Sequence, residues 1–193
     1  MFLTYALRIF FLPSELKKAK VVPLPKSTDK TNPTYYRPIS LLSVLSKLLE
    51  KHVHIYLNDC LEKWQLLHPF QSGFRHKYSC NTALTCLTNS WLTAMNKSEV
   101  SGVVFLDLKT AFDLVDHDIL LNKLAIYLKN SSSLPFLKSY LHNRTQCVLL
   151  NGFYSSKESV KYGVPQGSVL GPILFSLFIS DLPLHVKDKR YIC

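Results

Sequence analysis

The sequence predicts a mixed fold of helices and strands, either α/β or α+β, built as one domain or as two small lobes. Its 193 residues are 47% hydrophobic and 19% charged, which is typical of a folded globular protein. Some stretches repeat apolar residues at helical spacing, whereas others are continuously apolar or alternate. One predicted strand, residues 102–108, has helical patterns on both sides, which favours interspersed elements in a layered fold.

The N-terminal third is predicted to contain a short strand at residues 21–24 and a polar loop at 27–34. Ser40 is expected to cap a long amphipathic helix over residues 41–63. The apolar positions that recur at helical spacing in this helix are Leu41, Leu45, Leu48, Leu49, Val53, Tyr56 and Leu57.

The middle and C-terminal parts follow the same reasoning. Residues 71–78 form a polar loop that contains glycine, and Ser79 or Asn81 then caps a helix over 82–96. Residues 102–108 are predicted to be a fully buried strand, because their apolar run is continuous and β-branched at its start. The remaining predicted elements are a helix at 117–129, a hairpin of strands 145–150 and 157–162 turning at Asn151 and Gly152, and a helix from about Gly167 to Asp181.

Composition restricts the function classes. The net charge of +10 suggests an anionic partner, most often nucleic acid. The five cysteines form no CxxC pair and the histidines no HExxH, so neither a disulfide framework nor a zinc site is expected. The apolar N-terminus is interrupted by Arg8 and lacks a cleavage site, and no apolar run is long enough to span a bilayer. We therefore do not expect a secreted protein, and the sequence leaves the location open between nucleus and cytoplasm.

A cluster of acids follows the predicted strand 102–108. Asp107 stands at its end, where a buried carboxylate is costly unless it is paired or bound to a metal. Asp113, Asp116 and Asp118 follow within twelve residues, and together these oxygens could hold a hard divalent cation. For those three the simpler interpretation is a solvated or helix-capping acid. Asp107 is the predicted metal ligand.

The string FLDLKTAFD at residues 105–113 resembles the first palm motif of reverse transcriptases from non-LTR (LINE/jockey-like) retrotransposons. That resemblance implies that Asp107 is catalytic and binds Mg²⁺ in a two-metal nucleotidyl transfer. It also implies that Phe112 lies under the sugar of the incoming nucleotide and favours deoxynucleotides. Ordinary core packing is the alternative role for Phe112.

A second string, GVPQGSVLGP at residues 163–172, is similar to the motif with which the same family shapes the floor for nucleotide and template base. Its glycines allow close backbone approach, and an amide can donate and accept hydrogen bonds. The resemblance implies nucleotide binding by Gln166 and Gly167. Residues 173–179 are expected in the core.

Two further blocks agree with this family. YRPISLL at residues 36–42, with VVPLPK before it, resembles the fingers, and implies that Arg37 and Lys26 bind the nucleotide triphosphate. QSGFRHKYSCNTAL at residues 71–84 implies a template-binding role for Arg75, with a solvated turn as the alternative. The predicted fold is thus α+β, polymerase right-hand fingers (residues 1–78) and a partial palm (79–193), with mixed helices and a small antiparallel sheet.

The resemblance implies an RNA-directed DNA polymerase with an RNA template, a DNA or RNA primer, dNTP and Mg²⁺. Such enzymes continue into a hairpin with a second pair of aspartates, and the sequence shows no such pair, so we expect a fragment that is inactive alone. A second metal carboxylate would be sought first at Asp113 or Asp181. The alternatives are a catalytically inactive remnant that binds nucleic acid, and a fragment of a group II intron-like maturase.

Overall fold

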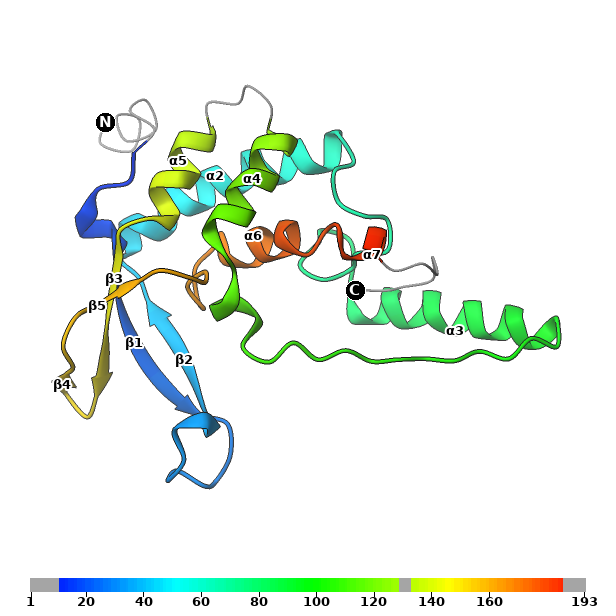
Figure 1. The fold of residues 1–193 in the computed structure, drawn as a ribbon, viewed down its shortest axis with the longest axis horizontal. Coiled ribbons are helices and arrows are strands. Elements are labelled where there is room, and N and C mark those ends of the chain that lie inside the picture. Colours follow the sequence, from blue (N-terminus) through cyan, green and yellow to red (C-terminus); the bar gives the residue numbers. More distant parts are fainter. Residues whose placement is uncertain (1–10, 129–132, 186–193) are drawn as a thin grey trace.

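The computed structural model describes residues 11–128 and 133–185 as helices packed beside a small sheet (Figure 1). The predicted features of the extreme N-terminus, and the residues after 185, lie outside this part. Short 3₁₀ helices are η1 (Ser14–Lys17), η2 (Pro33–Tyr35) and η3 (Ala111–Leu114). The strands are β1 (Lys18–Pro25), β2 (Tyr36–Leu41), β3 (Arg144–Leu150), β4 (Phe153–Tyr154) and β5 (Glu158–Val160). The α-helices are α2 (Val44–Lys63), α3 (Cys80–Asn96), α4 (His117–Tyr127), α5 (Ser133–Leu141), α6 (Gly171–Phe178) and α7 (Leu182–His185).

The sheet has the strand order β2-β1-β3-β4, with β5 also paired to β3. Three of its pairings are antiparallel, as predicted, but β1 and β3 run parallel, so the sheet is mixed. The predicted hairpin is confirmed: β3 and β5 are antiparallel, and the turn after β3 places Asn151 and Gly152 at φ of 51° and 85°. Positive φ at both positions matches the Asn-Gly signal of a tight hairpin turn.

One hydrophobic core lies among α2, α4, α5 and α6. Leu49, Leu57, Leu120, Leu137 and Leu174 belong to this single cluster and are almost completely buried. Residues on both sides of position 78 contribute to it, so the two predicted regions share a core. The boundary between fingers and palm at residues 78 and 79 stays a prediction.

The start of the long helix α2 differs from the prediction. Ser43, and not Ser40, is the N-cap, because its side chain accepts a hydrogen bond from the Ser46 amide. Ser40 lies in β2, paired with Val21 of β1. Tertiary pairing thus extends the strand through a segment whose apolar spacing alone suggested a helix.

The predicted buried strand at residues 102–108 is wrong. The segment is extended but pairs with no strand in the described part of the chain, and Val104, Phe105 and Leu106 are 82%, 83% and 79% exposed. Figure 1 shows the segment running below α3, away from the sheet. A strand needs a hydrogen-bonded neighbour, and the described residues supply none beside it.

Two other helices agree with the prediction in different degrees. Ser79 caps α3 in a capping box with Thr82. Of the two predicted caps, Ser79 and Asn81, the structure confirms Ser79. Helix α6 begins at Gly171, four residues after the predicted start, because residues 163–170 form a turn instead. The predicted core role of residues 173–179 is confirmed: Ile173, Leu174 and Leu177 are at most 2% exposed.

Candidate functional site

The turn over residues 163–170, called here the glycine turn, occupies the space between β2 and η3. Its backbone is bonded to both. The Ser40 amide of β2 donates to the Gln166 carbonyl oxygen at 2.7 Å. On the other side, the Gly163 amide donates to the Val115 carbonyl oxygen at 2.7 Å and the Val164 amide to that of Phe112 at 2.8 Å. The glycine turn therefore joins three segments that are distant in sequence.

Glycine is required at two positions of this turn. Gly163 has a φ of +85°, and an added Cβ would lie 2.8 Å from the Asp113 carbonyl oxygen. Gly167 has a φ of +105°, and an added Cβ would lie 3.0 Å from the Ser40 carbonyl oxygen. Both the positive φ and the close backbone approach exclude larger residues. The close neighbour at each glycine is the protein's own backbone, and the predicted close approach of these glycines to a ligand stays a prediction.

A buried carboxylate holds the end of the glycine turn. Glu50 of α2 is fully buried, and its Oε2 accepts hydrogen bonds from the amides of Val169 and Leu170 at 2.7 and 3.2 Å. Its Oε1 accepts another from the Ser46 hydroxyl at 3.0 Å. These three donors compensate for desolvation of the carboxylate. Sequence reasoning missed Glu50. A signal was present: Glu50 precedes Val53 and Leu57 at helical spacing, so it lies on the apolar face of the helix.

Gln166 and Asp113 lie in direct contact. The Gln166 Nε2 is 3.1 Å from both Oδ1 and Oδ2 of Asp113, which belongs to η3. Asp113 therefore caps no helix: it is partly exposed, and its hydrogen-bond partner is a side chain 53 residues away. For Asp116 the expectation of a helix cap is confirmed, since its Oδ1 accepts from the amides of Asp118 and Ile119 at the start of α4.

Phe112 is half-buried beside this contact. Its ring stacks on Phe175 of α6 with centroids 4.9 Å apart, and meets Phe74 edge to face at 5.8 Å. Such ring pairs stabilise packing beyond their buried area. The structure thus shows the packing role that was the alternative for Phe112, and its predicted role beneath a nucleotide sugar stays a prediction.

Arg37 and Lys26 are neighbours near the end of the β1–β2 hairpin. Arg37 pairs with Leu24, and the Lys26 amide donates to the Tyr35 carbonyl oxygen at 2.6 Å, which continues the ladder. Directly opposed residues and every second residue along a strand share one face, so both cations lie on the same face of the hairpin. Both side chains are exposed, as a phosphate-binding role requires.

Arg75 is engaged within the protein. Its Nε lies 3.0 Å from the Glu62 Oε1, its Nη1 donates to the His68 carbonyl oxygen, and its guanidinium stacks 4.5 Å from the Tyr78 ring centroid. The hydrogen bonds that Arg75 donates to the Glu62 carboxylate raise the pKa of Arg75 above its ordinary value. The predicted template contact stays a prediction. The turn around Arg75 is largely exposed, as the alternative expected, but the Arg75 side chain itself is anchored to Glu62 and His68.

Asp107 is exposed in the extended segment and not buried at a strand end, which corrects the argument from burial. A carboxylate oxygen is a suitable donor for Mg²⁺. Among residues 11–128 and 133–185, however, no three His, Cys, Asp or Glu side chains are grouped to hold a metal. Asp113 contacts Gln166, and Asp181 lies 2.6 Å from Lys123 Nζ. The described residues therefore do not fit a complete magnesium site.

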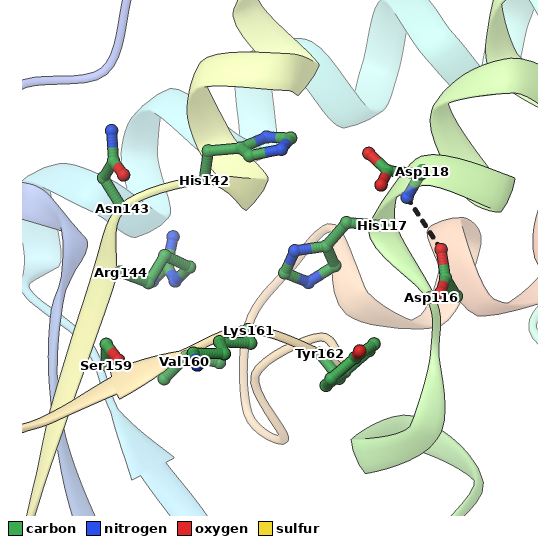
Figure 2. Close-up of a pocket in the computed structure, with 10 residues that line it drawn as sticks. All are labelled: Asp116, His117, Asp118, His142, Asn143, Arg144, Ser159, Val160, Lys161 and Tyr162. Atoms are coloured by element: carbon green, nitrogen blue, oxygen red, sulfur yellow. Dashed lines mark hydrogen bonds between the residues drawn. The ribbon is translucent and has the colours of Figure 1, made fainter.

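A hollow of about 400 Å³ lies behind the glycine turn, between α4, the end of α5 and β5 (Figure 2). His117 is buried there, and its Nε2 lies 2.7 Å from the Gly163 carbonyl oxygen. Because a carbonyl oxygen only accepts, Nε2 carries the proton. Acidic and basic side chains both line the hollow, which contains none of the predicted site residues.

Comparison with solved structures defines the class of fold. Apo telomerase from Candida tropicalis, truncated from its C-terminal domain, superimposes with a TM-score of 0.61 at 16% identity, over 90% of this chain and 40% of that one. The fold is accordingly that of polymerase fingers and palm, which confirms the predicted α+β class.

Sequence comparison then identifies the family. The family described as "Reverse transcriptase (RNA-dependent DNA polymerase)" matches residues 24–193, so the chain belongs to the reverse transcriptase family. The "Probable RNA-directed DNA polymerase from transposon BS" of Drosophila melanogaster is 40% identical over 95% of this chain and 21% of its own length. The "RNA-directed DNA polymerase from mobile element jockey" of the same species is 37% identical over 93% of this chain and 20% of its own.

These relatives confirm the predicted resemblance to non-LTR retrotransposons. The "Group II intron-encoded protein LtrA" of Lactococcus lactis is a weaker match, 27% identical over 83% of this chain and 24% of its own length, which disfavours the maturase alternative. The chain spans about a fifth of the length of the two Drosophila relatives. Within residues 11–128 and 133–185, no helix has the length and apolarity needed to cross a membrane.

Proposed function

We propose that this chain forms the fingers and part of the palm of an RNA-directed DNA polymerase, and that the glycine turn with Phe112 is the floor of its nucleotide site. The observation that supports this most is the bonding of the glycine turn to both β2 and η3. It unites three motifs: Gln166 and Gly167 in the turn, Phe112 in η3, and Arg37 three residues before Ser40 in β2. The Drosophila relatives, named as RNA-directed DNA polymerases, agree.

The remaining roles extend the same proposal. Arg37 and Lys26, exposed on one face of the β1–β2 hairpin, bind the triphosphate of a dNTP as charge-assisted donors. Asp107, exposed in the extended segment, would contribute one oxygen ligand to Mg²⁺. An RNA template and a DNA or RNA primer bind through their phosphates to a chain with a net charge of +10, with Arg75 on the template side.

Sugar selection tests the proposal in a longer protein that contains this chain and extends a primer. Phe112→Val should relax selection towards ribonucleotides, because the smaller side chain leaves room for a 2′-hydroxyl. Phe74→Val is the matched control, since Phe74 contacts the Phe112 ring and has no proposed contact with the sugar. If the preference for dNTP over rNTP is unchanged in Phe112→Val, Phe112 has no role in sugar selection and serves only in packing. In the same protein Asp107→Ala should abolish extension and leave template binding nearly intact.

The alternative is an inactive remnant that binds nucleic acid. It is favoured by the incomplete metal-ligand set of the described residues. Salt-sensitive binding to RNA is expected of both candidates, because both keep the basic surface. Primer extension separates the two candidates. If the longer protein extends a primer and Asp107→Ala abolishes this extension, the inactive remnant is excluded. If the longer protein binds RNA but extends no primer, the remnant is supported.

A further inference from the structure

The contact between Gln166 and Asp113 links the glycine turn to the η3 helix through side chains. The Gln166 amide nitrogen is equally close, at 3.1 Å, to the two carboxylate oxygens of Asp113. Both residues are partly buried, so the bond is only partly exposed to competing water. A hydrogen bond to a carboxylate is roughly twice as strong as one between neutral groups.

The backbone around this contact is held in place. Hydrogen bonds from Gly163 and Val164 reach the carbonyl oxygens of Val115 and Phe112, which flank Asp113 in sequence. Gly163 also packs directly on the Asp113 backbone, which leaves no space for a Cβ. The carboxylate of Asp113 is therefore presented to Gln166 by a fixed frame and not by a mobile loop.

The chemistry of the two groups determines the orientation of the amide. An ionised carboxylate can only accept hydrogen bonds, so the Gln166 Nε2 must face Asp113 and Oε1 must face away from it. Without the carboxylate, rotation of the amide by 180° would cost little, and either atom could face a ligand. Asp113 thus selects which end of the Gln166 amide is free.

We infer that Asp113 is a positioning residue that orients the Gln166 amide so that its oxygen is the atom offered to the nucleotide. The inference rests on the proposed function for the role of Gln166 in nucleotide binding. Gln166 then recognises a hydrogen-bond donor of the nucleotide, and Asp113 acts through Gln166 without touching the substrate. Loss of one such oriented hydrogen bond should weaken nucleotide binding about three- to tenfold.

The first test measures primer extension by the longer protein. Asp113→Asn keeps the size of the side chain but adds a donor, so it no longer dictates the amide orientation. We expect the KM for dNTP to rise about three- to tenfold while kcat changes little. Asp113→Glu, which keeps an acceptor-only carboxylate, should recover part of the loss, and Asp118→Asn, an exposed acid five residues away, should change neither constant.

A double-mutant comparison separates orientation from general structural damage. In a Gln166→Ala background, Asp113→Asn should add no further change in KM, because the amide it orients is gone. Additive effects would overturn the inference, as would a fall in kcat with no change in KM.

The second test needs no activity. In the 193-residue chain, the side-chain amide resonances of Gln166, identified by their loss in Gln166→Ala, should shift in Asp113→Asn and stay unmoved in Asp118→Asn. Unmoved resonances in Asp113→Asn would overturn the inference whether or not the longer protein polymerises. A longer protein that extends no primer would instead contradict the proposed function, and the resonances would still decide whether Asp113 holds Gln166.

Discussion

Two apolar runs of this chain, one next to each of the two motif strings, have opposite environments. Residues 173–177 of α6 are buried, with Leu174 and Leu177 completely inaccessible. Residues 103–106 are just as apolar, yet Phe105 is 83% exposed. A helix satisfies its own backbone hydrogen bonds and needs only a packing surface, which α6 finds in the shared core. A strand needs a paired neighbour, and residues 102–108 have none among the described strands.

The difference divides the candidate site. Gln166 and Gly167 belong to the packed region, where Glu50, Ser40 and Asp113 hold the glycine turn in place. Asp107 belongs to the uncovered segment, which reaches η3 through Thr110 in the left-handed region at φ 55°. The proposed nucleotide floor is therefore held by contacts within the described residues, whereas the segment that carries Asp107, the proposed metal ligand, is uncovered.

The largest expected effect comes from truncating one residue in each run. Leu174→Ala should lower the free energy of unfolding by about 2 to 5 kcal/mol, because it leaves a cavity in the core. Phe105→Ala should change the free energy of unfolding by less than about 0.5 kcal/mol, because the exposed ring makes few packing contacts. Urea denaturation followed by circular dichroism measures both. A Phe105→Ala loss as large as that of Leu174→Ala would show that residues 102–108 are covered in solution.

A smaller effect is expected from the glycines of the two regions. Gly163→Ala should destabilise the fold by about 1 to 3 kcal/mol, since its φ is positive and its new Cβ would meet the Asp113 backbone. Gly102→Ala is the matched control: an added Cβ there has nothing within 4 Å. Its thermal midpoint should stay near that of the parent chain. Equal midpoints for the two variants would contradict the close approach of the glycine turn to η3.

The smallest expected effect comes from removing the N-caps of the helices α2 and α3. Ser43→Ala removes the N-cap of α2, which contributes to the core, and should lower global stability by about 1 kcal/mol. Ser79→Ala removes the cap of α3, where Ala94 is the buried residue. It should lower the free energy of local opening of α3 by about 1 kcal/mol, so amide hydrogens in α3 should exchange faster, while exchange in α2 should stay unchanged. Faster exchange throughout α2 in Ser79→Ala would show that α3 is coupled to the core.

The sequence by itself determined the family, the α+β class and the elements whose signals are local. The capping box at Ser79, the hairpin turn at Asn151 and Gly152, and the apolar helix after Gly171 depend on residues within a few positions of one another. Such signals are readable from one stretch of chain because the interactions that cause them lie within that stretch. The motif strings also predicted nucleotide-site roles for Gln166 and Phe112; the fold bonds the glycine turn that carries Gln166 to the Phe112 carbonyl oxygen, and the two roles stay predictions.

Only the tertiary structure decided the features that depend on distant partners. Ser40 became a strand residue through pairing with Val21, and Glu50 became an anchor of the glycine turn 119 residues away. Asp113 acquired Gln166 as a partner, whereas residues 102–108 acquired no neighbouring strand. Burial and hydrogen bonding are properties of neighbours in space, so an apolar or acidic residue does not by itself indicate whether a partner will stand beside it.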